Sequence, residues 1–156
     1  MQTTVKGARM DTRHEAEGAE FLVLGHLLIE KIIAHKTYTR IPGYDLTAIN
    51  PETHKSARIQ VKSRWATDFD GGFICKNFDC DFFVLVALNR GHRYSKKKDL
   101  QGKHEPDFHV FPVDVVASAS KLTSSKWGKV LKRKIPNVEE YRNRWDLIRD
   151  YLACGR

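Results

Sequence analysis

Cysteine is scarce in this sequence, which argues against a disulfide-stabilised domain. The three cysteines, Cys75, Cys80 and Cys154, are an odd number and form no disulfide framework. Cys75 and Cys80 stand five residues apart in an apolar region, without the second pair of ligands that would indicate a zinc site. Reduced thiols in an intracellular protein are the favoured interpretation.

Long hydrophobic runs are also missing, which argues against a membrane protein. The most hydrophobic stretch, from Phe21 to Ala34, is interrupted by polar residues and is too short to span a bilayer. Residues 1–10 have no apolar segment of the kind found in a signal peptide. We therefore expect a cytoplasmic protein without a membrane partner.

Acidic residues are outnumbered by basic ones, and this imbalance points to a polyanionic partner. The chain has 27 Lys and Arg against 19 Asp and Glu, a formal net charge of +8. Nucleic acid is the commonest partner of so basic a small domain, although many basic proteins do not bind it. With 156 residues, of which 41% are hydrophobic and 29% charged, the chain suffices for one globular domain.

Hydrophobic periodicity predicts a single α/β domain over residues 1–156, with a flexible N-terminus at 1–14 and C-terminal helices within 120–156. We expect these elements: a largely buried helix at 15–35, hairpin strands near 44–49 and 57–64, strands at 81–88 and 108–113, a short turn at 114–119, and helices at 124–134 and 138–152. The order predicts a mixed β-sheet flanked by helices.

The predicted hairpin carries a polar patch. Successive strand residues point to opposite faces, so Gln60 and Lys62 share the face opposite Ile59 and Val61. Asp45 lies where a loop enters the first strand, a position at which aspartate invites explanation. If the strands pair, the Asp45 carboxylate, the Gln60 amide oxygen and the Lys62 ammonium converge. These are the groups needed to hold a divalent metal and to cut a phosphodiester bond. Taken singly, a turn-capping aspartate and a solvent-facing stripe explain the same residues.

A further carboxylate, Glu20, extends the core-facing stripe of the first helix, in line with Leu24 and Leu27. A carboxylate there must be paired, hydrated or metal-bound, because burying it alone is costly. An acid favoured by the dipole at the helix N-terminus is the simpler interpretation of Glu20 by itself. Glu17, one turn earlier, is a weaker candidate of the same kind.

In their order along the chain, these residues resemble the PD-(D/E)XK nuclease superfamily, which has the restriction-endonuclease-like fold. The nearest resemblance is to its small group with Gln in place of the second acid, such as the intron-associated homing endonucleases. The segments that carry it, within about residues 15 to 90, are Gly18-Ala19-Glu20, Gly43-Tyr44-Asp45-Leu46 and Arg58-Ile59-Gln60-Val61-Lys62-Ser63. Two departures are Tyr44 in place of the family's Pro directly before Asp, and Gln60, which removes a negative charge.

The resemblance implies a metal-dependent phosphodiesterase with Mg²⁺, or Mn²⁺, as its cofactor. Asp45, the side-chain oxygen of Gln60 and the carbonyl of Val61 are the implied metal ligands. Glu20 is implied to act on the metal directly or through water, and Lys62 to orient the attacking water. The expected products carry 5′-phosphate and 3′-hydroxyl ends. Contacts with the nucleic-acid backbone are expected from Ser63, Arg64, Arg90, Arg93, Lys96, Lys97, Lys98 and Lys103.

Three alternatives stay open at this point. The chain could be a DNA-binding or assembly module of the same fold with a site too weak for catalysis. The neutral Gln60 is the feature that supports this alternative. The chain could process RNA by the same chemistry, although DNA is favoured, or be an unrelated basic α/β protein. Cutting both strands of a duplex would favour a homodimer or larger oligomer, but no residue pattern specifies one.

Overall fold

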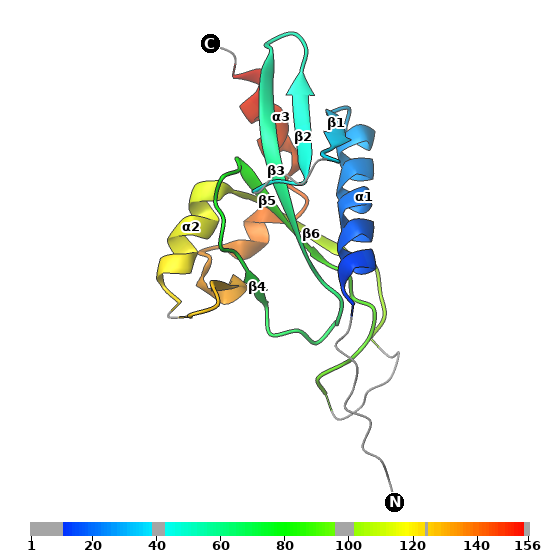
Figure 1. The fold of residues 1–156 in the computed structure, drawn as a ribbon, viewed down its shortest axis with the longest axis vertical. Helices are drawn as coiled ribbons and strands as arrows, with labels where there is room; N and C mark the ends of the chain where they lie inside the picture. The colour runs from blue at the N-terminus through cyan, green and yellow to red at the C-terminus, as the bar shows by residue number, and fades with distance from the viewer. Residues whose placement is uncertain (1–10, 39–42, 96–101, 124, 155–156) are drawn as a thin grey trace, which may run out of the picture.

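A long first helix, a five-stranded mixed sheet and a small second sheet make up the fold (Figure 1). The computed structural model describes residues 11–38, 43–95, 102–123 and 125–154. The helices are α1 (Arg13–Ile29), α2 (Val113–Lys121) and α3 (Trp145–Ala153), with 3-10 turns η1 (Lys132–Lys134) and η2 (Val138–Tyr141). The strands are β1 (Ile33–Lys36), β2 (Leu46–Asn50), β3 (Lys55–Arg64), β4 (Gly72–Ile74), β5 (Phe82–Ala87), β6 (Asp107–Pro112) and β7 (Lys129–Leu131). No helix in the described ranges is long and apolar enough to cross a membrane.

The longest strand, β3, organises the large sheet, whose order is β1-β2-β3-β5-β6. It pairs antiparallel with β2, with Leu46 opposite Ile59, and parallel with β5, with Ile59 opposite Phe82. The β1–β2 and β5–β6 pairs are antiparallel, whereas β4 and β7 form a separate two-stranded sheet. Residues 60–64 of β3 extend past the start of β2 and pair with β5 alone, so the sheet is open on one side of β3 there.

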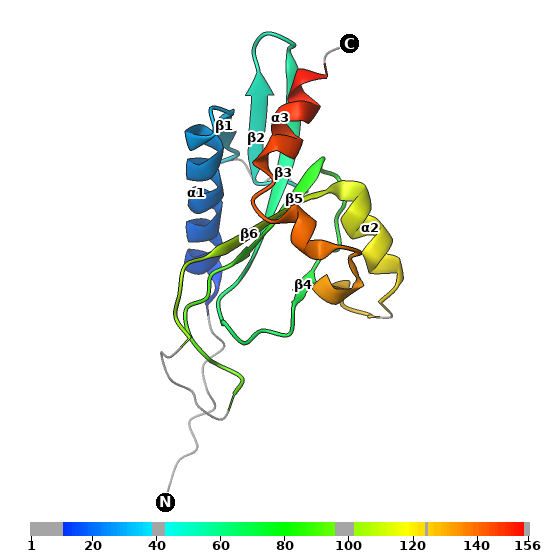
Figure 2. The same cartoon turned by 180° about the vertical axis from the view of Figure 1, so that it is seen from behind.

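Both faces of the large sheet are covered, as the two opposite views show (Figures 1 and 2). On one face, α1 and α3 pack against the sheet through Val23, Leu27 and Ile148. On the other face, α2 and the small sheet pack through other buried side chains, among them Phe73, Val116 and Val130. The predicted mixed sheet flanked by helices is thereby confirmed.

The first helix ends earlier than its apolar pattern predicts. It stops at Ile29, and the expected helical residues 33–35 belong to the edge strand β1. Lys31 has a φ of +64°, while the Ile32 amide donates to the Leu27 carbonyl and the Lys31 amide to the Leu28 carbonyl. These two bonds form a Schellman end, which glycine usually supplies. The absence of glycine there left the sequence without a stop signal.

The first helix is also less buried than predicted. Only its sheet-facing stripe is fully covered, by way of Ala19, Val23 and Leu27. The opposite side is open: Phe21 is 50% exposed and Ile29 is 73% exposed. Apolar residues around more than half of α1 therefore did not mean that the helix is buried on all sides.

The two ends of the chain differ from the predictions as well. Helix α1 begins at Arg13, inside the segment 1–14 expected to be flexible, and residues 1–10 lie outside the described part of the chain. The helix expected at 124–134 is replaced by β7 and η1, because Gly128 has a φ of +71° and its carbonyl accepts from the Cys75 amide. The helix expected at 138–152 is split into η2 and α3, since Asn143 has a φ of +52° between them and its amide donates to the Phe108 carbonyl.

Candidate metal and nucleic-acid site

Asp45 lies where the chain enters β2, just before the strand begins. Its amide donates to the Ile59 carbonyl at 2.9 Å, which continues the β2–β3 register and sets Asp45 opposite Gln60. Its carboxylate oxygen Oδ2 accepts the Val61 amide at 2.8 Å. The carboxylate is therefore fixed by the backbone of the strand that carries Gln60 and Lys62.

A cleft of about 500 Å³ opens beside this point, where β3 runs past β2. The N-terminal half of α1 forms one wall, and the end of β3 with the segment that follows forms another. The residues that line the cleft are Thr12, Glu15, Ala16, Glu20, Asp45, Gln60, Val61, Lys62, Ser63, Arg64, Trp65, Ala66, Arg93 and Tyr94. The four side chains predicted to act in catalysis, Glu20, Asp45, Gln60 and Lys62, thus share one cleft.

The side-chain oxygen of Gln60 is the most unusual polar atom in this cleft. Oε1 is buried and has no hydrogen-bond partner among the described residues. A buried amide oxygen without a donor is costly, so such an atom calls for a ligand. Amide oxygens are hard donors that suit Mg²⁺.

Two of the acids that line the cleft, Glu20 and Asp45, have carboxyl pKa values raised by burial. Burial raises the pKa of Glu20, and the negative charge of Asp45 raises it further. Burial likewise raises the pKa of Asp45, against the opposing influence of the Val61 amide and of the charges on Lys62 and Lys36. Two partly buried carboxylates that disfavour each other's ionisation would both be stabilised by a divalent ion.

Lys36 is a residue of this region that the sequence did not indicate. Its side chain is only 6% exposed, and Nζ lies 3.0 Å from Glu17 Oε1 and 3.2 Å from Glu20 Oε2. Of the two acids that pair with Lys36, Glu20 lines the cleft and Glu17 does not. Because residues 33–35 were expected to continue the helix, the strand that carries Lys36 was missed.

A second feature that the sequence did not indicate is Asp68, which fixes the far wall of the cleft. Its carboxylate accepts the amides of Arg93, Tyr94 and Ser95 at 2.8, 2.9 and 2.7 Å. Desolvation opposes ionisation, but these backbone bonds outweigh it and lower the pKa of Asp68 to about 2. Asp68 is therefore the anchor that joins residues 93–95 to the segment after β3.

The two arginines of this far wall, Arg64 and Arg93, make different contacts. Arg64 donates to the Gly72 carbonyl at 2.6 Å and to the Tyr94 hydroxyl at 3.3 Å, so it braces the segment beside the cleft. The guanidinium carbon of Arg93 lies 4.5 Å from the centre of the Trp65 ring, a cation–π contact. Trp65, the aromatic residue directly after Arg64, is the feature of the sequence that could have indicated this wall.

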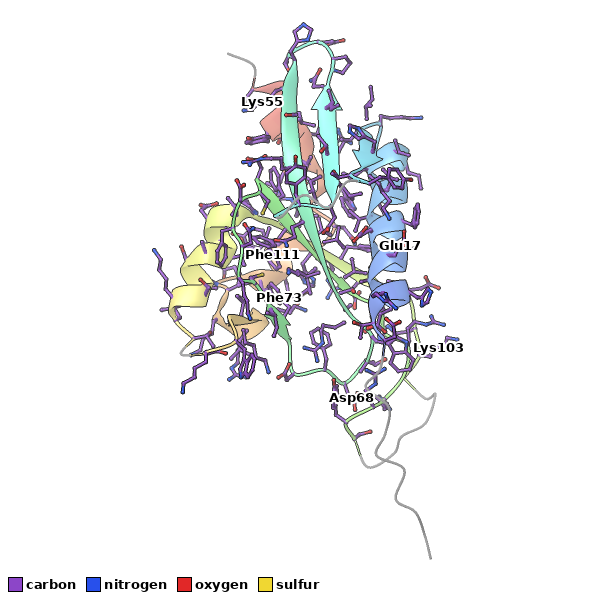
Figure 3. The ribbon with its side chains drawn as sticks, viewed as in Figure 1. Glu17, Lys55, Asp68, Phe73, Lys103 and Phe111 are labelled. Carbon is purple, nitrogen blue, oxygen red and sulfur yellow. The ribbon has the colours of Figure 1, made fainter. Side chains whose placement is uncertain are left out.

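The other predicted backbone contacts lie outside the cleft or outside the described residues. Arg90 does not line the cleft, and its amide donates to the Trp65 carbonyl at 2.9 Å. Lys103 is exposed and lies, like Asp68, at the end of the molecule where α1 begins (Figure 3). Lys96, Lys97 and Lys98 fall outside the described part of the chain.

The donor set in the cleft fits a divalent metal of the Mg²⁺ type. Asp45 offers a fixed carboxylate, and Gln60 offers an oxygen without a hydrogen-bond partner in the ranges that the structure describes. Across the described ranges, no three His, Cys, Asp or Glu side chains are grouped to hold an ion. A metal here would therefore depend on the amide oxygen and on main-chain or water oxygens in addition to carboxylates.

Comparison with known proteins gives a match at the level of structure only. No family model matches the sequence, and no curated protein matches it. A solved structure titled as that of a bacterial homing endonuclease, I-Ssp6803I, is similar over 93% of this chain and 96% of that chain. The sequence identity is 21% and the TM-score is 0.59. The chain therefore shares the fold of this bacterial homing endonuclease.

Proposed function

We propose that the protein is a metal-dependent nuclease of the PD-(D/E)XK type that hydrolyses phosphodiester bonds in DNA. The observation that carries the proposal is the buried Oε1 of Gln60, which has no hydrogen-bond partner in the described part of the chain and lies in one cleft with Asp45, Glu20 and Lys62. The shared fold with a homing endonuclease supports DNA over RNA as the substrate. The net charge of +8 is compatible with a polyanionic partner.

In this proposal Asp45, Gln60 Oε1 and the Val61 carbonyl hold Mg²⁺ or Mn²⁺, and Glu20 contributes directly or through water. When bound, the metal supplies a lowered pKa for a coordinated water and screening of the phosphate charge. The Val61 amide holds Asp45 in a fixed orientation, so the carboxylate needs little reorganisation to bind.

Lys62 is proposed to orient the attacking water and to stabilise the negative charge that develops on the phosphoryl group. It stands two residues after Gln60 on β3 and lines the same cleft. Ser63 and Arg93, further along the wall, are proposed to contact neighbouring phosphates. Arg64 braces this wall through two guanidinium hydrogen bonds within the protein, and its contact with phosphate stays a prediction.

A catalytically weak nucleic-acid-binding module is the second candidate, and the neutral Gln60 favours it. One negative charge fewer in the ligand set weakens the attraction for a divalent ion. This candidate has the same cleft and the same partner, and it differs only in the absence of turnover.

The test is cleavage of supercoiled plasmid and single-stranded DNA by purified protein with Mg²⁺, Mn²⁺ or EDTA. Asp45→Asn and Lys62→Met are the site variants, and Asp114→Asn and Lys121→Met, both exposed on α2, are the matched controls. We expect metal-dependent nicking that falls at least about 10²-fold in both site variants and persists in both controls. DNA binding without cleavage under all conditions would favour the binding module, and cleavage that survives Asp45→Asn would contradict the proposed site.

A further inference from the structure

Lys36 is a buried cation directly behind the cleft. Lysine is almost never buried unless it is paired. Here the ammonium lies between two carboxylates one turn apart on α1, 3.0 Å from Glu17 Oε1 and 3.2 Å from Glu20 Oε2. It also lies 4.2 Å from the centre of the Phe21 ring. These contacts come from one helix and fix the ammonium beside it.

The backbone places this cation next to the proposed metal ligands. Lys36 is opposite Leu46 in the β1–β2 pair, and the amide of Thr37 donates to the carbonyl of Asp45 at 2.9 Å. The ammonium is also among the positive charges that stabilise the ionised form of Asp45. Lys36 therefore acts on two acids of the cleft, on Glu20 by contact and on Asp45 at longer range.

A second metal ion at Glu20 would need the carboxylate that Lys36 already contacts. Glu20 Oε2 and Glu17 Oε1 both face the ammonium. The grouping of three acidic or His and Cys side chains that could hold an ion is absent from the described ranges. Of the acids that line the cleft, Glu15 and Glu20 come from α1, whereas Asp45 lies beside Gln60 and forms with it a pair of side-chain ligands for one ion.

We propose that the Lys36 ammonium takes the place of a second metal ion, so that the cleft binds a single divalent cation at Asp45 and Gln60. This inference rests on the proposed function and refines it. Lys36 is then a positioning residue, since it holds the Glu20 carboxylate in place and neutralises the acidic side of the cleft without touching the substrate. A fixed ammonium on a strand supplies positive charge without a second ion.

The test counts bound ions by titrating the full-length protein with Mn²⁺ and following the signal of free Mn²⁺ by electron paramagnetic resonance. We expect one ion per chain for wild type and for Lys36→Arg, which keeps the charge. Lys36→Met removes the charge at similar volume, and it should bind two ions because Glu20 and Asp45, which line the cleft, lose this counter-charge. Lys121→Met, an exposed lysine on α2, should bind one.

Each other outcome overturns the proposal in an identifiable way. Two ions in wild type, with DNA cleavage retained, would remove the role of Lys36 and leave the proposed nuclease standing. One ion in a folded Lys36→Met protein would show that Lys36 does not exclude a second ion. No ion in wild type would overturn the single-ion site, and the plasmid assay would then decide the proposed function independently. If Lys36→Met does not fold, Lys36→Gln, which also removes the charge, takes its place: two ions would support the inference and one ion would overturn it.

Discussion

At the scale of single residues, the proposed metal site has the neutral Gln60 where an acid would give more charge. Among the described residues, Gln60 Oε1 is buried without a hydrogen-bond partner beside two acids, Glu20 and Asp45, whose pKa values are raised by burial. A third carboxylate would add repulsion in the metal-free protein and attraction for a metal. In the proposed site, Gln60 would therefore balance the stability of the metal-free protein against its affinity for the ion.

Replacing Gln60 tests this balance directly. Gln60→Glu should tighten Mn²⁺ binding about tenfold, or about 1.4 kcal/mol, while lowering the melting temperature in EDTA. Gln60→Met, which removes the oxygen at similar volume, should weaken Mn²⁺ binding by at least as much. Isothermal titration and thermal unfolding measure both effects. Equal Mn²⁺ affinity in all three proteins would mean that Gln60 is not a ligand.

The raised pKa of Asp45 gives a second prediction, on the pH dependence of stability without metal. Because the folded protein keeps the proton at pH values where the unfolded chain has released it, the free energy of unfolding falls as the pH rises above the ordinary pKa of 3.8. The free energy of unfolding of wild type minus that of Asp45→Asn, both measured in EDTA, should therefore fall as the pH rises from 3.8 to the raised pKa of the folded protein. Mg²⁺ should reverse the trend, since it binds the ionised carboxylate. Urea unfolding measures the difference, and a rise with pH in EDTA would contradict the assignment.

At the scale of elements, the site depends on how β2 is entered. Gly43 has a φ of +106°, and a Cβ there would lie 2.7 Å from the Asp79 carbonyl oxygen. This turn brings the chain to Asp45, whose carboxylate then meets the Val61 amide. Gly25, on α1, has no atom within 4 Å of an added Cβ.

These two glycines give a matched pair of substitutions. Gly43→Ala should lower the free energy of unfolding by about 1–3 kcal/mol, because the strained φ and the clash act together. Gly25→Ala should raise it by up to about 1 kcal/mol through helix propensity. Denaturant unfolding of both variants is the measurement. A Gly43→Ala protein as stable as wild type would mean that the turn before β2 can take another conformation.

The elements also show which features a sequence can indicate. The strands around Gln60 and the buried strand at 81–88 were predictable, because alternation and a continuous apolar run are local signals. The end of α1 was not, because Lys31 adopts a left-handed conformation without the usual glycine. Missing that end hid the edge strand and with it Lys36. Asp68 was equally hidden, since its three amide partners lie about 25 residues further along the chain.

At the scale of the whole molecule, the cleft lies toward one end of a basic chain. The start of α1, Asp68 and Lys103 lie at that end (Figure 3). Asp68 holds the backbone of residues 93–95, so the Arg93 charge can be removed while the wall keeps its backbone anchor. The contribution of the Arg93 charge to DNA binding can therefore be measured apart from that of the net charge of the whole molecule.

The salt dependence of DNA affinity distinguishes the contribution of Arg93 from that of the net charge. Binding of DNA by the Asp45→Asn protein should weaken steeply between about 50 and 200 mM salt, as expected when phosphate contacts release counterions. Arg93→Gln in that background should reduce the slope of log affinity against log salt by about 1, and Lys121→Gln on α2 should leave it unchanged. Fluorescence anisotropy with labelled duplexes measures the slopes. Equal slopes for Arg93→Gln and its parent would remove Arg93 from the interface.

The most direct test of the central claim is to locate Mn²⁺ by anomalous diffraction in crystals of the protein soaked in that ion. We predict a peak in the cleft within coordination distance of an Asp45 oxygen and Gln60 Oε1, and no such peak in Asp45→Asn crystals. Saturated crystals without a peak at Asp45 and Gln60, or with Mn²⁺ bound only elsewhere, would contradict the account.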